Sequence, residues 1–336
     1  MEDPRSSQLR DHPEAGEAVY TRSVTGSVAD EYAALREGAA LFDLPATVLR
    51  LSGGKAVELL NSVLTNQVPG EGNLGVYALL LNPKGRIQTD LRVLKTTGGD
   101  VLVAVEPEGA GAAKELLGRY APFYRTGLED LSAAGDAPWG ILGLYGMGAR
   151  DLLEGSELAE HETAEVTLGG ADLLAAGVSV PVGGYDLLGP ADALVAAREH
   201  LVGRGAVPVG LGAYETARVE AGIPRFGADI TPENFPAEAG ILNRAVSFEK
   251  GCYPGQETVA RMRYRGHPNK TLHRLAVEGA AAPGAAILQN GKPVGTVTSV
   301  APLPVDGETH ALGYLSRNAD ARGELRARDA LLRTLA

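Results

Sequence analysis

The chain of 336 residues contains one cysteine, Cys252, so it cannot form an internal disulfide. This excludes a disulfide-stapled secreted domain and suits a reducing cytoplasm. No run reaches the roughly 18 apolar residues of a membrane-spanning helix. The polar N-terminus also lacks the basic start and apolar core of a signal peptide. We therefore expect a soluble, cytoplasmic protein with no membrane partner.

Positive charge is scarce: 31 Lys and Arg stand against 42 Asp and Glu, which gives a net charge of −11. This balance argues against direct nucleic-acid binding, which needs a basic surface. The exception is the segment 250–270, where basic residues outnumber a single acid, Glu257. Its basic residues are Lys250, Arg261, Arg263, Arg265 and Lys270. The segment is either an ordinary solvated face or a local anion site beside Cys252.

Common motifs for metals and phosphates are also missing. The sequence has no CxxC, no HExxH and no GxxxxGK[ST], and no GxGxxG opens a helix after a strand. A closed structural metal site is therefore excluded, although Cys252 could supply one ligand to a transient one. A Cys–His nucleophilic pair with His267 or His273 has no recognisable third group.

The pattern along the chain predicts three regions. Residues 1–18 are polar and Pro-containing, and we expect a disordered tail. Residues 19–268 mix helical and strand patterns, which indicates an α+β region of two subdomains. Residues 269–336 consist of short apolar runs with Gly, Pro and Asn turns, which predicts a small all-β domain.

Local signals place several elements within these regions. Residues 76–81 and 86–94 should form a hairpin around Asn82-Pro83-Lys84-Gly85. A helix is expected over 211–222, ended by Gly222 and Pro224. Asn290-Gly291 signals a second hairpin in the C-terminal region. Asp90 falls inside a predicted strand, where we expect it to face solvent.

Cys252 has two open interpretations. A free cysteine is often buried and inert. However, Tyr253-Pro254-Gly255-Gln256 suits a type II turn, and a helix could begin just after it with Glu257 in its first turn. Cys252 would then lie near a helix N-terminus beside Lys250 and Arg261, conditions that favour the thiolate.

The predicted helix over 211–222 offers a second candidate site. Tyr214 and Arg218 are four residues apart and share a face, with Glu220 close by. Tyr could stack on a flat heterocycle while Glu accepts from its ring N–H groups. The alternatives are a half-buried core aromatic and ordinary surface charges.

The segment KGCYPGQE, followed by TVARMRYRG, resembles the signature of the YgfZ proteins. These form the folate-binding branch related to the aminomethyltransferase (T-protein) of the glycine cleavage system. The resemblance extends to EYAALREGAALFDL, LLNSVLTNQV, YALLLNPKGRIQTDLRV and RVEAGIPRFGADITPENFPAEAG, and to the C-terminal β region.

The resemblance implies an α+β, aminomethyltransferase (GcvT)-like folate-binding body in a ring arrangement, closed by a C-terminal β-barrel. It implies tetrahydrofolate or a one-carbon derivative as cofactor, and assembly or repair of iron–sulfur clusters, including those of tRNA-thiolating enzymes, as function. Iron–sulfur client or assembly proteins would be partners.

The resemblance also implies site residues. Cys252 and Lys250 match the family's motif, whose loop would face bound folate at the channel mouth. The motif loop further includes Gly251, Pro254, Gly255 and Glu257. The expected folate contacts are Tyr214, Arg218, Glu220, Lys250, Tyr253, Gln256 and Arg261.

Two departures from the T-protein pattern bear on the activity. The T-protein's Asp-Asp pair reads Thr89-Asp90 here, and the segment PVGGYDLLGP lacks the Glu that holds the pterin. Both differences argue against aminomethyl transfer, so we expect the iron–sulfur role. The alternative is a tetrahydrofolate-dependent aminomethyltransferase of the glycine-cleavage type, for which Asp90 is the available carboxylate. A non-catalytic module that binds RNA or a protein through 261–270 is a third hypothesis.

Overall fold

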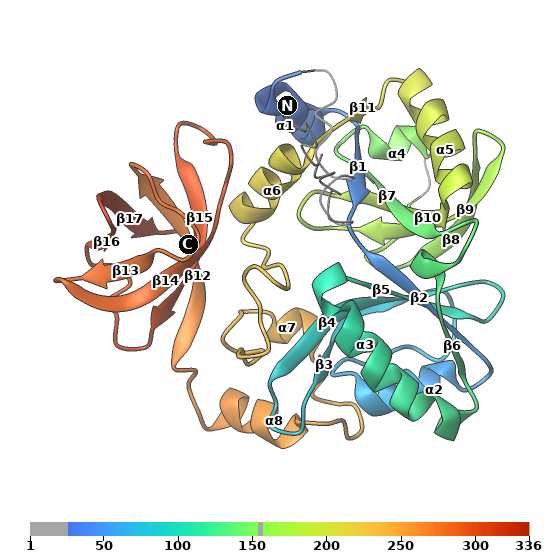
Figure 1. Ribbon diagram of the computed structural model, residues 1–336, viewed down its shortest axis with the longest axis horizontal. Helices are drawn as coiled ribbons and strands as arrows, with labels where there is room; N and C mark the ends of the chain where they lie inside the picture. Colours follow the sequence, from blue (N-terminus) through green and yellow to red (C-terminus); the bar gives the residue numbers. More distant parts are fainter. Residues whose placement is uncertain (1–25, 154–156, 336) are drawn as a thin grey trace, which may run out of the picture.

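The computed structural model describes residues 26–153 and 157–335, so the expected tail at 1–18 lies outside the described residues. The chain forms two sheet-based halves of a body and a separate barrel, which lie around a centre crossed by α6 and the segment after it (Figure 1). This is the expected α+β, GcvT-like arrangement with a closed C-terminal barrel.

One half of the body is a five-stranded antiparallel sheet in the order β3-β4-β5-β2-β6. Helices α2 and α3 pack on one of its faces through apolar side chains such as Leu59, Leu60 and Leu117. The bounds are β2 Thr47–Ser52, α2 Ala56–Val63, β3 Val76–Leu81, β4 Ile87–Lys95, β5 Val101–Val105, α3 Pro107–Tyr120, the 3-10 turn Ala121–Tyr124 and β6 Gly127–Asp130.

The other half is a six-stranded sheet in the order β11-β1-β7-β10-β9-β8, antiparallel except for the β1–β11 pair. Helix α5 covers one face of it (Figure 1). The bounds are α1 Val28–Glu37, β1 Ala40–Leu44, the 3-10 turn Leu131–Ala133, β7 Trp139–Tyr145, α4 Ala149–Leu152, β8 Thr163–Leu168, β9 Ala171–Val178, β10 Gly184–Pro190, α5 Ala191–Gly203, β11 Val207–Pro208 and α6 Leu211–Glu220.

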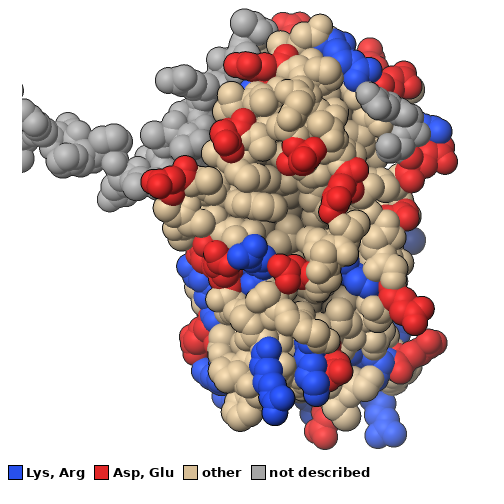
Figure 2. All heavy atoms as spheres, turned by 90° about the vertical axis from the view of Figure 1, so that its right-hand side faces the viewer, with Lys and Arg blue, Asp and Glu red and all other residues tan. Residues whose placement is uncertain are grey.

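The two sheets meet through a shared apolar cluster. Val48, Leu94 and Leu102 of the five-stranded sheet pack against Ile141 and Leu188 of the six-stranded sheet. Burial of such side chains is the main favourable term in holding the two halves together. On the face opposite the barrel, acidic side chains predominate over the upper half, whereas Lys and Arg are interspersed with acids below (Figure 2).

The barrel closes in the order β12-β15-β14-β13-β16-β17. Its bounds, with those of the two connecting helices, are α7 Leu242–Ala245, α8 Gln256–Tyr264, β12 Lys270–Glu278, β13 Ala286–Gln289, β14 Lys292–Val300, β15 Thr309–Ser316, β16 Leu325–Ala327 and β17 Ala330–Thr334. The sequence places a boundary at 268/269, and we propose the connection between α8 and β12 as the domain boundary.

Turn chemistry explains several of these elements. Asn290 and Gly291 both have positive φ, 51° and 76°, as the predicted two-residue hairpin loop requires. Gly222, with φ 73°, follows the end of α6 and lets the chain turn away from the helix. In the part of the chain that the structure describes, no helix is long and apolar enough to cross a bilayer.

Candidate functional site

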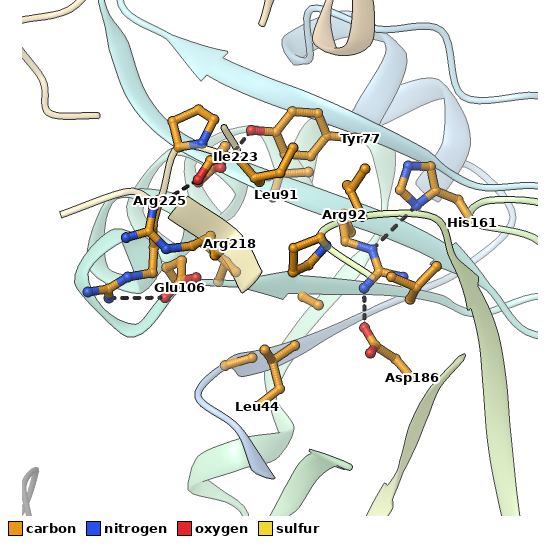
Figure 3. Close-up of a pocket in the computed structure, with 18 of the residues that line it drawn as sticks. Leu44, Tyr77, Leu91, Arg92, Glu106, His161, Asp186, Arg218, Ile223 and Arg225 are labelled. Carbon is orange, nitrogen blue, oxygen red and sulfur yellow. Dashed lines mark hydrogen bonds and ion pairs between the residues drawn. The ribbon is translucent and has the colours of Figure 1, made fainter. Parts of the chain in front are cut away.

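A cavity lies where the two sheets and the segment after α6 meet. Its volume is about 150 Å³. Apolar side chains such as Leu44, Val178 and Ile223 form part of its wall. The polar and aromatic lining comprises Tyr77, Asp90, Arg92, Glu106, Tyr145, Glu160, His161, Asp186, Tyr214, Arg218, Arg225 and Arg244 (Figure 3).

Asp90 points into this cavity from β4. Its side chain is buried, and the hydroxyl of Tyr77, opposite Arg92 on β3, donates to its Oδ2 at 2.7 Å. The other oxygen, Oδ1, is buried without a hydrogen-bond partner. Burial raises the pKa of Asp90, and the Tyr77 hydroxyl offsets part of that rise. The expectation that Asp90 faces solvent was wrong, because the second sheet covers this face of β4.

Glu106 is a second carboxyl in the same cavity. It precedes the first turn of α3 but makes no side-chain capping bond, and its Oε2 is buried without a hydrogen-bond partner. The nearest cation, Arg225, has its Nη1 3.9 Å from that oxygen (Figure 3). Burial first, and then the charge of Asp90, raise the pKa of Glu106 to about 8. Glu106 therefore exchanges its proton near neutral pH.

Arg92 lies across the cavity from Glu106 (Figure 3). Its Nη1 forms an ion pair with Asp186 of β10, which links the two sheets. Its Nε lies 3.3 Å from Nδ1 of His161. Burial, together with the charges of Arg92 and Arg244, lowers the pKa of His161 to about 3, so the imidazole is neutral. A neutral ring can accept the Arg92 hydrogen bond at Nδ1.

Two of the expected folate contacts, Tyr214 and Arg218, do line the cavity. The ring of Tyr214 is stacked on Phe42 with centroids 4.4 Å apart, so one of its faces is already occupied. The side chain of Arg218 is fully occupied, because all five of its N–H groups donate hydrogen bonds within the protein. The acceptors are Glu215, Ile223, Asp229 and Ser299. Arg218 therefore ties α6 to the barrel and has no donor left for a ligand.

Glu220 does not belong to the cavity. Its carboxylate accepts from the hydroxyl of Tyr32 and pairs with Arg36 of α1, 2.8 Å from Nη1. The expected role of Glu220 in holding a heterocycle stays a prediction that this cavity does not support, because residues 218 and 220 lie on different faces of the helix. Arg218 points to the barrel, whereas Glu220 points to α1.

Lys250 and Tyr253 are structural in this arrangement. The buried Nζ of Lys250 donates to the carbonyl oxygens of Asn61 and Leu64 at the end of α2. It lies 5.2 Å from the centroid of the Tyr253 ring, which packs in a core with Leu79 and Ile87. Burial lowers the pKa of Lys250 to about 8. Neither side chain lines the cavity, so their expected contact with folate stays a prediction without support from this cavity.

The rest of the motif forms a turn and a helix start away from the cavity. Gly255 has φ 83° and Gln256 N–H donates to the Tyr253 carbonyl, which confirms the predicted type II turn before α8. A Cβ at Gly255 would come within 2.7 Å of the Asn82 carbonyl oxygen, so the glycine permits the loop to pack on the β3–β4 turn. Cys252 is exposed.

None of residues 250–257 lines the cavity, and Arg261 borders a separate hollow on α8 with Glu257 and Tyr264. The expected position of the loop, at the channel mouth facing bound folate, stays a prediction, and this cavity does not support it for Gly251, Cys252, Pro254, Gln256 and Arg261. Among the residues that the structure describes, no group of three or more His, Cys, Asp or Glu is arranged to hold a metal ion.

Sequence reasoning missed Arg92, Glu106, His161 and Asp186. The alternation in β4 puts Asp90 and Arg92 on one face of the strand, which looks like a solvated face until the second sheet covers it. Asp186 does give a signal, because it is a lone charge within the apolar run YDLLG. Pro107 is a helix-start signal that places Glu106 at the end of β5.

The comparisons with known proteins agree with this architecture. The model of the family described as "GCVT N-terminal domain" matches residues 11–250. A relative named aminomethyltransferase from Rubrobacter xylanophilus is 30% identical over 313 residues, covering 89% of this chain and 82% of the relative. Another so named, from Moorella thermoacetica, is 28% identical over 321 residues, covering 88% and 84%.

Among solved structures, the glycine cleavage system aminomethyltransferase T from Bartonella henselae superposes with a TM-score of 0.80 at 23% identity. The match covers 92% of this chain and 88% of that one, and it shows the shared fold. Because the curated relatives are named aminomethyltransferases, the expected iron–sulfur function, with its client proteins and tRNA link, is corrected. The chain belongs to the GCVT N-terminal domain family.

Proposed function

We propose that this chain is a tetrahydrofolate-dependent aminomethyltransferase, which passes the one-carbon unit of an aminomethyl group to tetrahydrofolate. The observation behind the proposal is Asp90, a buried carboxyl that Tyr77 holds at one oxygen and that leaves the other free in the cavity. Relatives that match over most of their length and are named aminomethyltransferase support the reaction type.

The cavity has the properties that a folate ring would need. It combines apolar walls with buried polar atoms that have no partner in the protein: Asp90 Oδ1, Glu106 Oε2 and Arg92 Nη2. Such atoms are costly when buried unless a ligand or water satisfies them. Tetrahydrofolate, the expected cofactor, presents N–H donors and a carbonyl acceptor around one ring and supplies the nitrogen atoms that receive the one-carbon unit.

The two carboxyls can divide the proton transfers between them. The Tyr77 hydroxyl donates a hydrogen bond to Oδ2 of Asp90 and holds the carboxyl in place. Its other oxygen, Oδ1, has no partner and can accept a proton. Glu106, with its pKa of about 8, is protonated at neutral pH and can donate a proton to a departing amine. One carboxyl that accepts a proton beside another that donates one is a common arrangement for acid–base work.

The aminomethyl-transfer assay tests this function. Purified protein is given an aminomethyl donor and tetrahydrofolate, and formation of methylene-tetrahydrofolate is followed. Asp90→Asn should lower turnover by about 10²–10⁴-fold, since the amide cannot accept the proton. The control Asp329→Asn changes an exposed aspartate on the barrel and should have no effect. Absence of turnover by the unaltered protein, or full turnover by Asp90→Asn, would contradict the proposal.

The finer assignment to the YgfZ branch is a proposal about ancestry. It is supported by the segment Lys250–Glu257, of which only Lys250 lies within the matched family region. In this proposal the branch keeps the motif loop for a structural reason. Lys250 binds the end of α2, and Gly255 lets the loop pack on the β3–β4 turn.

A further inference from the structure

Arg92 and Asp90 form a matched donor and acceptor on one wall of the cavity. They are two residues apart on β4, whose pairing with β3 is regular through Leu79, Ala78 and Tyr77. Alternation therefore places both side chains on the same face, with Cα atoms roughly 7 Å apart. Each has one buried polar atom without a hydrogen-bond partner, Nη2 of Arg92 and Oδ1 of Asp90.

The guanidinium of Arg92 is held in place before any ligand binds. Asp186 binds Nη1, and the other oxygen of Asp186 accepts from the hydroxyl of Tyr145. His161 meets Nε on the opposite side. These contacts fix the plane of the guanidinium (Figure 3). Nη2 is not needed to link the two sheets, so it is a preorganised donor.

The charges around Arg92 decide which kind of acceptor fits. Asp186 neutralises Arg92, and Glu160 lies 2.8 Å from Nη2 of the neighbouring cation, Arg244. His161 adds no charge, because its pKa is lowered to about 3. This end of the cavity is thus electrically balanced. A neutral carbonyl oxygen satisfies Nη2, whereas a further anion would leave uncompensated charge in a buried site.

We infer that Arg92 is the residue that selects a ring carbonyl of the ligand: Nη2 donates to the 4-oxo oxygen of the tetrahydrofolate ring, and Asp90 Oδ1 accepts from an N–H on the same ring edge. This inference rests on the proposed function. In this inference Arg92 and Asp90 together recognise the ring, in place of the Glu that PVGGYDLLGP lacks. Arg92 acts in binding and specificity and moves no proton.

The test compares tetrahydrofolate with its 4-amino-4-deoxy analogue by calorimetric titration; the analogue has an amino group in place of the 4-oxo oxygen and no hydrogen on N3. The amino group replaces an acceptor with a donor, which faces the Arg92 N–H. Loss of a hydrogen bond to a charged group corresponds to a roughly tenfold to hundredfold loss in affinity. The unaltered protein should show this preference for the 4-oxo ligand, a result that needs no variant.

Arg92→Lys then keeps a positive charge beside Asp186 but removes the fixed fork of donors. The preference should fall toward equal affinity for both ligands. Arg36→Lys is the control, because Arg36 pairs with Glu220 outside the cavity, and it should keep the preference. Equal binding of both ligands by the unaltered protein, or an unchanged preference in Arg92→Lys, would overturn the inference while leaving the proposed function intact. Failure of tetrahydrofolate itself to bind would overturn both the inference and the proposed function.

Discussion

The Nζ of Lys250 lies 2.9 Å from the carbonyl oxygen of Asn61, in the last turn of helix α2, 189 positions away in the chain. It also bonds the carbonyl of Leu64. The last carbonyls of a helix have no partner within the helix. Lys250, which the sequence motif suggests as a catalytic residue, thus caps the C-terminus of α2 and joins that helix to the loop before α8.

Replacement of Lys250 by Met should destabilise the protein without affecting transfer. The substitution keeps much of the side-chain volume but leaves two carbonyl oxygens without a donor, which costs roughly 1–3 kcal/mol. Chemical denaturation measures the free energy of unfolding, and the transfer assay measures activity of the folded variant. A folded variant of normal stability that has lost turnover would show that Lys250 has a chemical role.

Cys252→Ser should leave both stability and aminomethyl transfer within about twofold of the unaltered protein, because surface substitutions away from special features have small effects. Cys252 is exposed and does not line the cavity. The assay is the one used for Asp90→Asn. A loss of turnover in well-folded Cys252→Ser would mean that the motif loop closes over the cavity during the reaction.

Titration of Glu106 should make the folded protein less stable as the pH rises from 4.5 toward 8. Its pKa is about 8 in the folded chain against an ordinary glutamate value of 4.5, so between these values the folded state holds the extra proton. Stability from this group is therefore full below pH 4.5 and is lost as pH rises toward 8. Glu106→Gln should match the unaltered protein at pH 5.

At pH 8 the Glu106→Gln variant should be more stable than the unaltered protein, by on the order of 2 kcal/mol. This is less than the full shift would give, because solvent reaches part of the carboxyl. Urea denaturation of both proteins at the two pH values measures the difference. A constant difference between pH 5 and pH 8 would contradict the raised pKa.

Titration of His161 changes the stability in the opposite direction, so that the protein loses stability as the pH falls. Its pKa is lowered to about 3 in the folded chain from 6.5, so between these values the unfolded chain binds the extra proton. Stability is lost as pH falls below 6.5, at up to roughly 1.4 kcal/mol per pH unit. His161→Asn keeps an acceptor near Arg92 without a titrating ring, and its unfolding free energy should fall less steeply in acid. Parallel curves would contradict the buried neutral imidazole.

Much of the fold was predictable because its signals are local. The β3–β4 hairpin, the Asn290-Gly291 hairpin and the turn before α8 follow from residues that set their own backbone angles. The end of helix α2 at Val63 has no such local signal, since apolar residues continue beyond it to Val68. Its end depends on Lys250, which no local pattern around α2 reveals.

The site was less predictable because it is made where separate sheets meet. Asp90 was the carboxylate of the alternative hypothesis, but its exposure was misjudged since the covering sheet is built from residues far along the chain. The partners of Glu220 could not be predicted for the same reason, because they belong to α1. Tyr214, expected from its place on one helix face with Arg218, does line the cavity, and its contact with folate stays a prediction.

The central claim is that tetrahydrofolate binds in the cavity between the two sheets, and a calorimetric titration tests it most directly. The unaltered protein, under reducing conditions at moderate salt, should bind one equivalent in the micromolar range, about −8 kcal/mol. Ala46→Trp places a large ring in the cavity wall and should abolish the heat of binding while the protein stays folded. Ala282→Trp, on an exposed barrel loop, is the control and should bind normally. No binding by the unaltered protein, or equal binding by Ala46→Trp, would contradict the account.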